Sequence, residues 1–435
     1  MNKFFINKEN KKQVLSWAFY DWANSAFATT ILAGFFPIFF KLYWNPGVEV
    51  TVSTARLGIA NSVAGIIVAI LAPILGVIAD SYSAKKKFLF FFTYLAILMT
   101  VSLALVSEGN WLFAVILFIF ANIGFSGGNI FYDSLITSVS DKKNVDLISS
   151  LGYSLGYLGG GVLFALNVWM TLQPDFFGFA NSSESIKFSF ISVGIWWAIF
   201  SIPIFLFVNE NNSLLENKKK EVVENSFRSS FSKLFHTFKK IKHYKTVYLF
   251  LIAYWFYIDG VDSIIRMAVD FGMSIGLESN DLIVALLVTQ FIGFPSAILF
   301  GYIGKKIGTK KGIYITLVVY LFVAIWGSLM NSKIEFFILA SIIGLVQGGV
   351  QALSRSFYSR IIPKESPAEF FGFYNMLGKF ATVLGPLIVG FVGLTVKNFG
   401  YSSEISSRIG MASISMLFII GGIVFYFVNE ERINS

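Results

Sequence analysis

Long apolar runs leave this chain few ways to fold. A helix of about twenty apolar residues spans the hydrocarbon core of a bilayer, and twelve runs in the 435 residues reach that length. They cover residues 14–43, 54–80, 87–107, 111–139, 146–171, 187–209, 246–275, 281–305, 309–331, 334–362, 367–397 and 404–429. The sequence therefore predicts an all-α membrane protein with twelve transmembrane helices.

Composition supports a membrane protein and excludes several kinds of site. Hydrophobic residues make up 55% of the chain and charged residues 14%, whereas soluble proteins carry roughly 25% charged residues. There is no cysteine, and both histidines, His236 and His243, lie in a lysine-rich polar segment. Thiolate sites and a histidine site within the membrane are thereby excluded. No phosphate-binding P-loop occurs, so we expect no metal, no cofactor and no ATP-driven transport.

Charge alternates between successive loops. Lysines and arginines gather in every second loop, as at Lys85–Lys87 and Lys142–Lys143, whereas the loops between them hold mainly acids such as Glu108 and Asp175. The positive-inside rule then places the basic loops and both chain termini in the cytoplasm. Membrane orientation also accounts for the net charge of +9, so we expect no nucleic-acid partner.

A parallel internal repeat divides the chain. The second run ends in GVIADSYSAKKKF and the eighth in GYIGKKIGTKKGI, which share a glycine at Gly76 and Gly301 and a lysine pair at Lys85–Lys86 and Lys310–Lys311. SGGNIFYDSLI in the fourth run is echoed by QGGVQALSRSF in the tenth. Repeats in the same order are typical of two-bundle secondary transporters. We expect an N-terminal six-helix bundle (1–209), a basic cytoplasmic linker (210–245) and a C-terminal six-helix bundle (246–435).

The loop after the second run resembles the best-known motif of the major facilitator superfamily, G-x-x-x-D-x-x-x-x-(K/R)-(K/R). Within it the chain resembles the vacuole-effluxer-like branch, through FYDWANSAFATTI, SLGYSLGYLGGG and the long stretch QGGVQALSRSFYSRIIPKESPAEFFGFYNMLGKF. The resemblance covers essentially the whole chain. It implies two pseudo-symmetric bundles that move a small solute by alternating access. Fungal members are regarded as amino-acid effluxers of the vacuole. The branch also has bacterial members, and we expect this protein in a bacterial inner membrane.

In this superfamily the loop acts as a cytoplasmic gate, in which the acid pairs with basic residues and helix ends. The resemblance therefore assigns a gate to Asp80, Lys85 and Lys86, and the partial positive charge of a helix N-terminus suits an acidic latch. The second copy of the loop has Lys305 at the position of the acid. The alternative is that the lysines only mark topology, which leaves Asp80 unexplained.

Polar residues inside the predicted helices are candidates for the transport site, because a charge at bilayer depth is costly. The candidate substrate-binding residues are Asp21 and Asn24 in the first run, Asn129 and Asp133 in the fourth, Tyr153 in the fifth, Asp259, Asp262 and Arg266 in the seventh, Gln347, Gln351 and Arg355 in the tenth, and Asn375 and Lys379 in the eleventh. In this superfamily the first, fourth, seventh and tenth helices line the cavity, and the acids and arginines of this set lie on those helices.

Each group also has a structural alternative. The acids of the seventh run can neutralise Arg266 in an ion-pair ladder. Arg355 can snorkel to the surface or clamp an acid, or its guanidinium fork can bind a carboxylate or phosphate of the substrate. Asp21 can cap its helix, the stripe with Asn129 can bond helix to helix, and Lys379 can form a buried ion pair. The glycines of the fifth run favour close helix packing.

The charge pattern suggests a zwitterionic substrate such as an amino acid, with its carboxylate on Arg355 or Lys379 and its ammonium group on Asp259 or Asp262. Burial disfavours the charged form of a carboxyl group, so Asp259 or Asp262 can carry a proton and couple transport to a gradient of protons or of another ion. We expect a proton-coupled transporter, monomeric in the lipid bilayer and not an enzyme. A lipid or phosphate-ester transporter or flippase is the alternative on the same fold.

Overall fold

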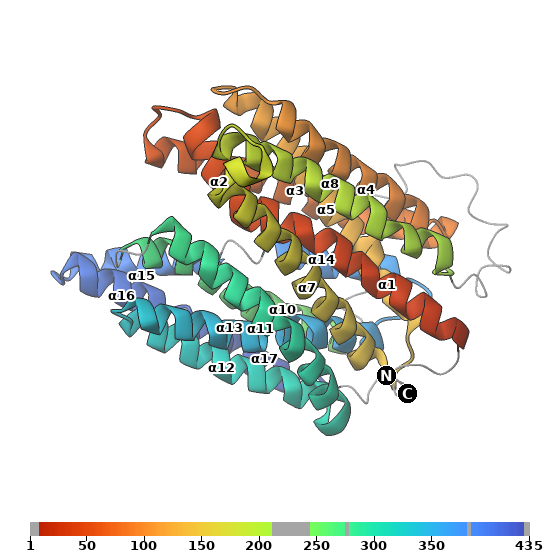
Figure 1. The fold of residues 1–435 in the computed structure, drawn as a ribbon. Helices are drawn as coiled ribbons and strands as arrows, with labels where there is room; N and C mark the ends of the chain where they lie inside the picture. Colours follow the sequence, from red (N-terminus) through yellow and green to blue (C-terminus); the bar gives the residue numbers. More distant parts are fainter. Residues whose placement is uncertain (1–7, 211–243, 275–277, 381–383, 430–435) are drawn as a thin grey trace. The chain divides into compact units, whose positions relative to one another are not determined.

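The structure of this chain, a computed structural model, describes residues 8–210, 244–274, 278–380 and 384–429 (Figure 1). Every regular element in those ranges is a helix. The first half of the sequence contains α1 (Lys8–Ala26), η1 (Phe27–Phe35), α2 (Phe36–Phe39), η2 (Phe40–Trp44), α3 (Val50–Tyr82), α4 (Lys85–Ser102), η3 (Leu103–Leu105), α5 (Trp111–Ser134), α6 (Ile136–Val139), α7 (Val145–Leu172), η4 (Pro174–Phe177) and α8 (Ser182–Phe207). The second half contains α10 (Lys245–Ser274), α11 (Ser279–Ile307), α12 (Thr309–Leu329), α13 (Lys333–Ile361), α14 (Pro367–Phe380), α15 (Leu384–Asn398), α16 (Ser403–Ala412) and α17 (Ser415–Tyr426).

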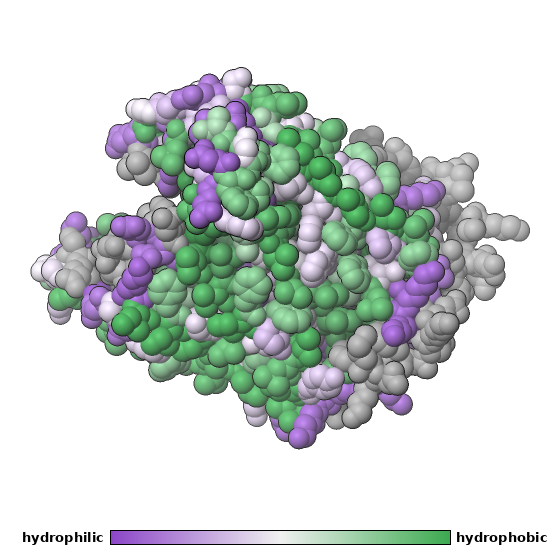
Figure 2. Space-filling view, in the orientation of Figure 1, coloured by the Kyte–Doolittle hydropathy of each residue, from purple (hydrophilic) through white to green (hydrophobic). Residues whose placement is uncertain are grey.

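Eleven stretches of the described residues are helical, long and apolar enough to cross a membrane, which agrees with the predicted all-α membrane protein. The predicted eleventh run, 367–397, forms α14 and α15 on either side of residues 381–383, which lie outside the described residues. Large apolar side chains stand exposed, such as Ile59 at 64% and Leu98 at 60%, and apolar residues cover much of the face drawn in Figure 2. Such a surface suits contact with lipid.

The described residues pack as two compact units. Unit 1 takes them from Met1–Asp141, Leu151–Glu224 and Glu365–Gly372, and unit 2 from Lys142–Ser150, Asn225–Lys364 and Phe373–Ser435. Each unit therefore contains a short segment from the other half of the sequence, and these segments hold the starts of α14 and α7, respectively. The predicted bundles 1–209 and 246–435 contain no such exchange. Most of the predicted linker 210–245 lies outside the described residues.

The internal repeat is visible in matching contacts at the starts of α4 and α12. In unit 1, Lys86 Nζ donates to the carbonyl oxygen of Val208, just after α8, at 2.7 Å. In unit 2, Lys310 Nζ donates to the carbonyl oxygen of Val428, just after α17, also at 2.7 Å. A lysine at the start of one helix thus binds the last carbonyls of the neighbouring helix in both units, where the partial negative charge of a helix end favours a cation.

These contacts correct the register of the repeat by one residue. Ser83 and Ala84 connect α3 to α4, whereas Gly308 alone connects α11 to α12. Gly308 has a φ of +97°, a conformation that glycine adopts without strain. The shorter connection makes Lys310 the counterpart of Lys86, whereas the alignment of the two sequence segments paired it with Lys85.

Glycines on α7 let it pack closely on α1 within unit 1, as the sequence predicted. A Cβ atom at Gly156 would lie 2.6 Å from Ser25 Oγ, and one at Gly159 would lie 2.5 Å from the carbonyl oxygen of Trp22. Larger residues would push the helices apart. Beyond Ala26, α1 continues as the π-helical segment η1, a rare conformation that is frequent at functional sites.

Candidate functional site

In unit 1, the predicted polar residues of α1 and α5 meet. Tyr132 OH donates to Asp21 Oδ2 at 2.6 Å, and Asn24 Nδ2 donates to Asn129 Oδ1 at 2.8 Å. Asp21 and Asn24 are only 7% and 3% exposed. The second bond joins two helices, which was the structural alternative for Asn129. Together the two bonds hold a carboxylate and two amides on neighbouring faces of α1 and α5.

Tyr132 positions Asp21, yet the sequence analysis did not select it. The rings of Tyr132 and Trp17 stack with their centroids 4.7 Å apart, and Trp17 Nε1 donates to the carbonyl oxygen of Tyr132 at 3.0 Å. The ring of Tyr20 lies 4.8 Å from that of Tyr132. A tyrosine in an apolar run carries no charge to mark it, although its place beside the buried Asp133 was a usable signal.

A third helix of unit 1 approaches this cluster. A Cβ atom at Gly156 on α7 would lie 3.5 Å from Asp21 Cβ. The predicted Tyr153 lies on the same helix, three residues earlier, and is half-buried, and Tyr157, one residue later, is buried. The acid of α1 therefore lies against the stretch of α7 that carries both tyrosines.

In unit 2, Asp259 on α10 binds the start of α15. Its carboxylate accepts from the backbone N–H groups of Leu384 and Gly385, each at 2.9 Å, and from Ser263 Oγ at 3.1 Å. Asp259 is fully buried, and a Cβ atom at Gly385 would collide with Ser263 Oγ. An acid at a helix N-terminus satisfies unpaired donors and meets the positive end of the helix dipole. These bonds give Asp259 a structural task that the sequence did not indicate.

The other candidates of unit 2 lie on α10, α13 and α14. The structure leaves Asp262, Gln347, Gln351, Asn375 and Lys379 half-buried. Arg266 belongs to α10, but its side chain is outside the described residues, so the predicted ladder with Asp262 remains a prediction.

Arg355 on α13 is buried within unit 2 and binds the segment 142–150. It is 1% exposed, its Nε donates to Ser149 Oγ at 3.0 Å, and its Nη2 donates to the carbonyl oxygen of Ser149 at 2.9 Å. Ser149 Oγ in turn donates to the carbonyl oxygen of Ala352 at 2.7 Å. Arg355 therefore does not snorkel to the surface; it clamps the first turns of α7 through a serine.

A buried acid that the sequence analysis missed, Asp146, lies in the first turn of α7. Its carboxylate accepts from Ser356 Oγ at 2.5 Å and from Thr309 Oγ1 at 3.0 Å, and it pairs with Arg360 Nη2 at 2.5 Å. Arg360 Nε also donates to the carbonyl oxygen of Lys142 at 3.1 Å. Asp146 is the first residue of the predicted run 146–171. An acid is common in the first turn of a helix, so its position gave no sign of a further task.

In unit 1, Asp80 at the end of α3 binds the start of α14. Its Oδ2 accepts from the backbone N–H of Glu369 at 2.8 Å, and its Oδ1 pairs with Lys85 Nζ at 3.1 Å. A Cβ atom at Gly76 would collide with the carbonyl oxygen of Ala368. The acid, the lysine and the glycine of the loop motif therefore all serve one contact between helix ends.

Lys86 has a different task from Lys85. Besides its bond to Val208, its backbone N–H donates to Glu210 Oε1 at 2.8 Å, and the backbone N–H of Lys85 donates to Glu210 Oε2 at 3.2 Å. Glu210 thus caps the start of α4. A sequence signal exists for this contact, because the four residues 207–210 (FVNE) recur at 427–430, at the ends of the sixth and twelfth runs.

Comparisons with known proteins agree with this architecture. The family described as "Vacuole effluxer Atg22 like" matches residues 43–434. The chain is 37% identical over 434 residues to the uncharacterized MFS-type transporter YxiO of Bacillus subtilis (strain 168), covering 99% of this chain and 97% of that one. It is 23% identical to autophagy-related protein 22 of Vanderwaltozyma polyspora, covering 91% and 88%.

Among solved structures, the proton:xylose symporter XylE has the same fold, with a TM-score of 0.69 at 12% identity over 97% of this chain and 95% of that one. The family match and the relative from Bacillus subtilis extend over nearly the whole sequence. The chain is a multi-pass membrane transporter and not an enzyme, and it belongs to the vacuole effluxer Atg22-like branch of the major facilitator superfamily.

Proposed function

We propose that the protein is a secondary transporter that moves a small zwitterionic solute, of the amino-acid class, by alternating access. The proposed mechanism is based on the buried charged groups that hold the starts of α7 and α14. Each of these helix starts belongs to a unit whose other residues come from the other half of the sequence. A helix start that is held by a buried charged group is a contact that a gate can release.

The strength of these contacts suits a gate. An acid at a helix N-terminus contributes roughly 0.3–1 kcal/mol, and up to about 2 kcal/mol when partly buried. A ligand must supply about 5.5 kcal/mol of differential binding to move an equilibrium from 1:99 to 99:1. Contacts of this size at Asp80 and Asp146 are large enough to favour one state and small enough for a bound solute to reverse that preference.

The polar groups suit a zwitterion. In unit 1, Asp21 and Asp133 are buried acids with the amide of Asn24 nearby on α1, and such a group of acceptors suits an ammonium ion. In unit 2, α14 carries the half-buried Lys379 four residues after Asn375, and a base of this kind suits a carboxylate. We propose that Lys379 or Arg355 binds the carboxylate of the solute.

We predict that amino acids stabilise the purified protein against heat, whereas sugars, nucleosides and phosphate esters do not. A ligand at one hundred times its Kd adds about 2.7 kcal/mol to the free energy of unfolding, which a thermal-shift assay in detergent detects. Asp21→Asn should abolish the shift, and Asp175→Asn, at an exposed position in η4, should retain it. A shift with phosphate esters alone would reject the zwitterion and support the phosphate-ester alternative.

We further propose that Asp262, a half-buried acid on α10, carries the coupling proton. Asp262→Asn should keep the melting temperature and remove the pH dependence of uptake into proteoliposomes. Asp259→Asn should lower the melting temperature, because an amide offers only one oxygen to the two N–H groups of α15, a loss of about 1–3 kcal/mol. Unchanged pH dependence in Asp262→Asn would reject this coupling site.

We predict that Asp146→Asn weakens the contact at the start of α7 and changes the rate of transport. The charged pair with Arg360 is lost, so the melting temperature should fall, while the side chain keeps its size, so helicity should stay normal. Asp141→Asn, an exposed acid five residues earlier, is the matched control. Uptake rates in Asp146→Asn equal to those of the control would mean that this contact takes no part in gating.

A further inference from the structure

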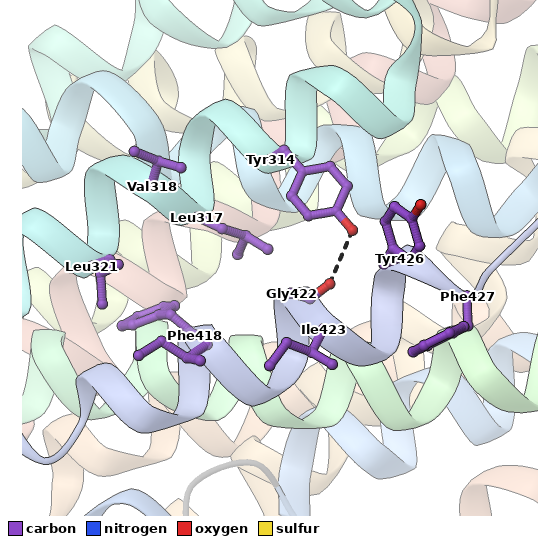
Figure 3. A pocket seen from close by; sticks show the side chains of 10 residues that line it. Tyr314, Leu317, Val318, Leu321, Phe418, Gly422, Ile423, Tyr426 and Phe427 are labelled. Carbon is purple, nitrogen blue, oxygen red and sulfur yellow. Dashed lines mark hydrogen bonds between the residues drawn. The ribbon is translucent and has the colours of Figure 1, made fainter.

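Unit 2 carries an apolar groove between α12 and α17 (Figure 3). Its cavity has a volume of about 440 Å³. Leu317 and Phe418 are 4% and 3% exposed and form its floor, and Tyr314 OH donates to the carbonyl oxygen of Gly422 at 2.9 Å across it. Val318 lines the groove and is 64% exposed, so the groove opens on the outer side of the helix pair.

The length of the groove fits one leaflet of a bilayer. Its lining on and just after α17 extends from Phe418 to Phe427, and these nine helical steps rise roughly 14 Å at 1.5 Å per residue. Half of a hydrocarbon core of about 30 Å is about 15 Å. A groove of this length and of purely apolar lining matches a single acyl chain that enters from one membrane face.

A free positive charge stands at the end of the groove. Lys311 is exposed and lies three residues before Tyr314, so both side chains share one face of α12. Lys310 is engaged, because its Nζ donates to the carbonyl oxygens of Tyr426 and Val428 at 2.9 and 2.7 Å. Within the part of the chain that the structure describes, Lys311 has no acidic or hydrogen-bonding partner.

We propose that this groove binds an anionic glycerophospholipid, with one acyl chain along α17 and the phosphate at Lys311. Basic residues at the ends of apolar clefts between transmembrane helices are a recognised pattern for anionic headgroups. The charge of Lys311 at one end of the groove suits a phosphate, and the apolar surface along the rest of the groove suits an acyl chain. A phospholipid has both parts. This site is separate from the polar residues assigned to transport.

In unit 1, aromatic rings occupy the position that corresponds to this groove. In the register set by Lys86 and Lys310, Phe90 and Tyr94 on α4 correspond to Tyr314 and Val318. The rings of Phe90 and Tyr94 lie 4.4 Å apart, and each also contacts Phe205, at 5.3 and 6.4 Å, respectively. The groove in unit 2 therefore depends on a valine where unit 1 has a tyrosine.

Native mass spectrometry of the full chain, equilibrated with equal amounts of phosphatidylglycerol and phosphatidylcholine, tests the headgroup. The wild-type protein should retain phosphatidylglycerol preferentially. Lys311→Gln should reduce that preference about fivefold, the effect of roughly 1 kcal/mol per lysine. Lys87→Gln removes the corresponding exposed lysine of α4 and should leave the preference unchanged. Equal preferences in the two variants would overturn the proposal.

Two further variants test the groove itself. Val318→Tyr copies unit 1 from the α12 side, and Gly422→Leu fills the groove from α17, where a Cβ atom has no neighbour closer than 3.9 Å. Both should reduce retained lipid of either headgroup without lowering the melting temperature. Unchanged lipid retention in both, or displacement of the lipid by soluble glycerol phosphate at millimolar concentration, would overturn the assignment of the acyl chain to this groove.

Discussion

The first turn of a helix has backbone N–H groups that have no partner within the helix. Three carboxylates meet this requirement here: Asp80 at the start of α14, Asp259 at the start of α15 and Glu210 at the start of α4. Each acid comes from another part of the chain and joins two elements that are distant in sequence.

The apolar runs were sufficient to predict the helices and the fold class, because hydrophobic length is set by the bilayer and does not depend on partners. The contact between Asp259 and the backbone N–H groups of Leu384 and Gly385 was not predicted. Leu384 lies 125 residues away from Asp259, and periodicity within one run carries no information about such a partner.

The sequence predicted part of the candidate site. Charge in an apolar run correctly drew attention to Asp21, Asn24 and Arg355, since burial of such groups needs a reason. Their partners were missed, because Tyr132 is uncharged, Ser149 is small, and Asp146 lies at the edge of a run. Residue type and spacing identified some of the buried groups, whereas their tasks depend on contacts between distant segments.

The two halves of the repeat solve the same problem with different residues. In unit 1 the acid, Asp80, lies on α3 and binds the start of α14. In unit 2 the repeat places Lys305 at the position of Asp80. The acid there, Asp146, lies on α7 itself, and Arg360 on α13 binds it. The polarity of the contact is thus reversed between the halves.

The most direct test of this account is to lock one contact. The chain has no cysteine, so the double variant Asp146→Cys and Thr309→Cys can be joined by a short bifunctional thiol reagent without side reactions. The account predicts that the joined protein still binds its solute but does not transport it, and that cleavage of the link restores uptake. Uptake at an undiminished rate in the joined protein would contradict it.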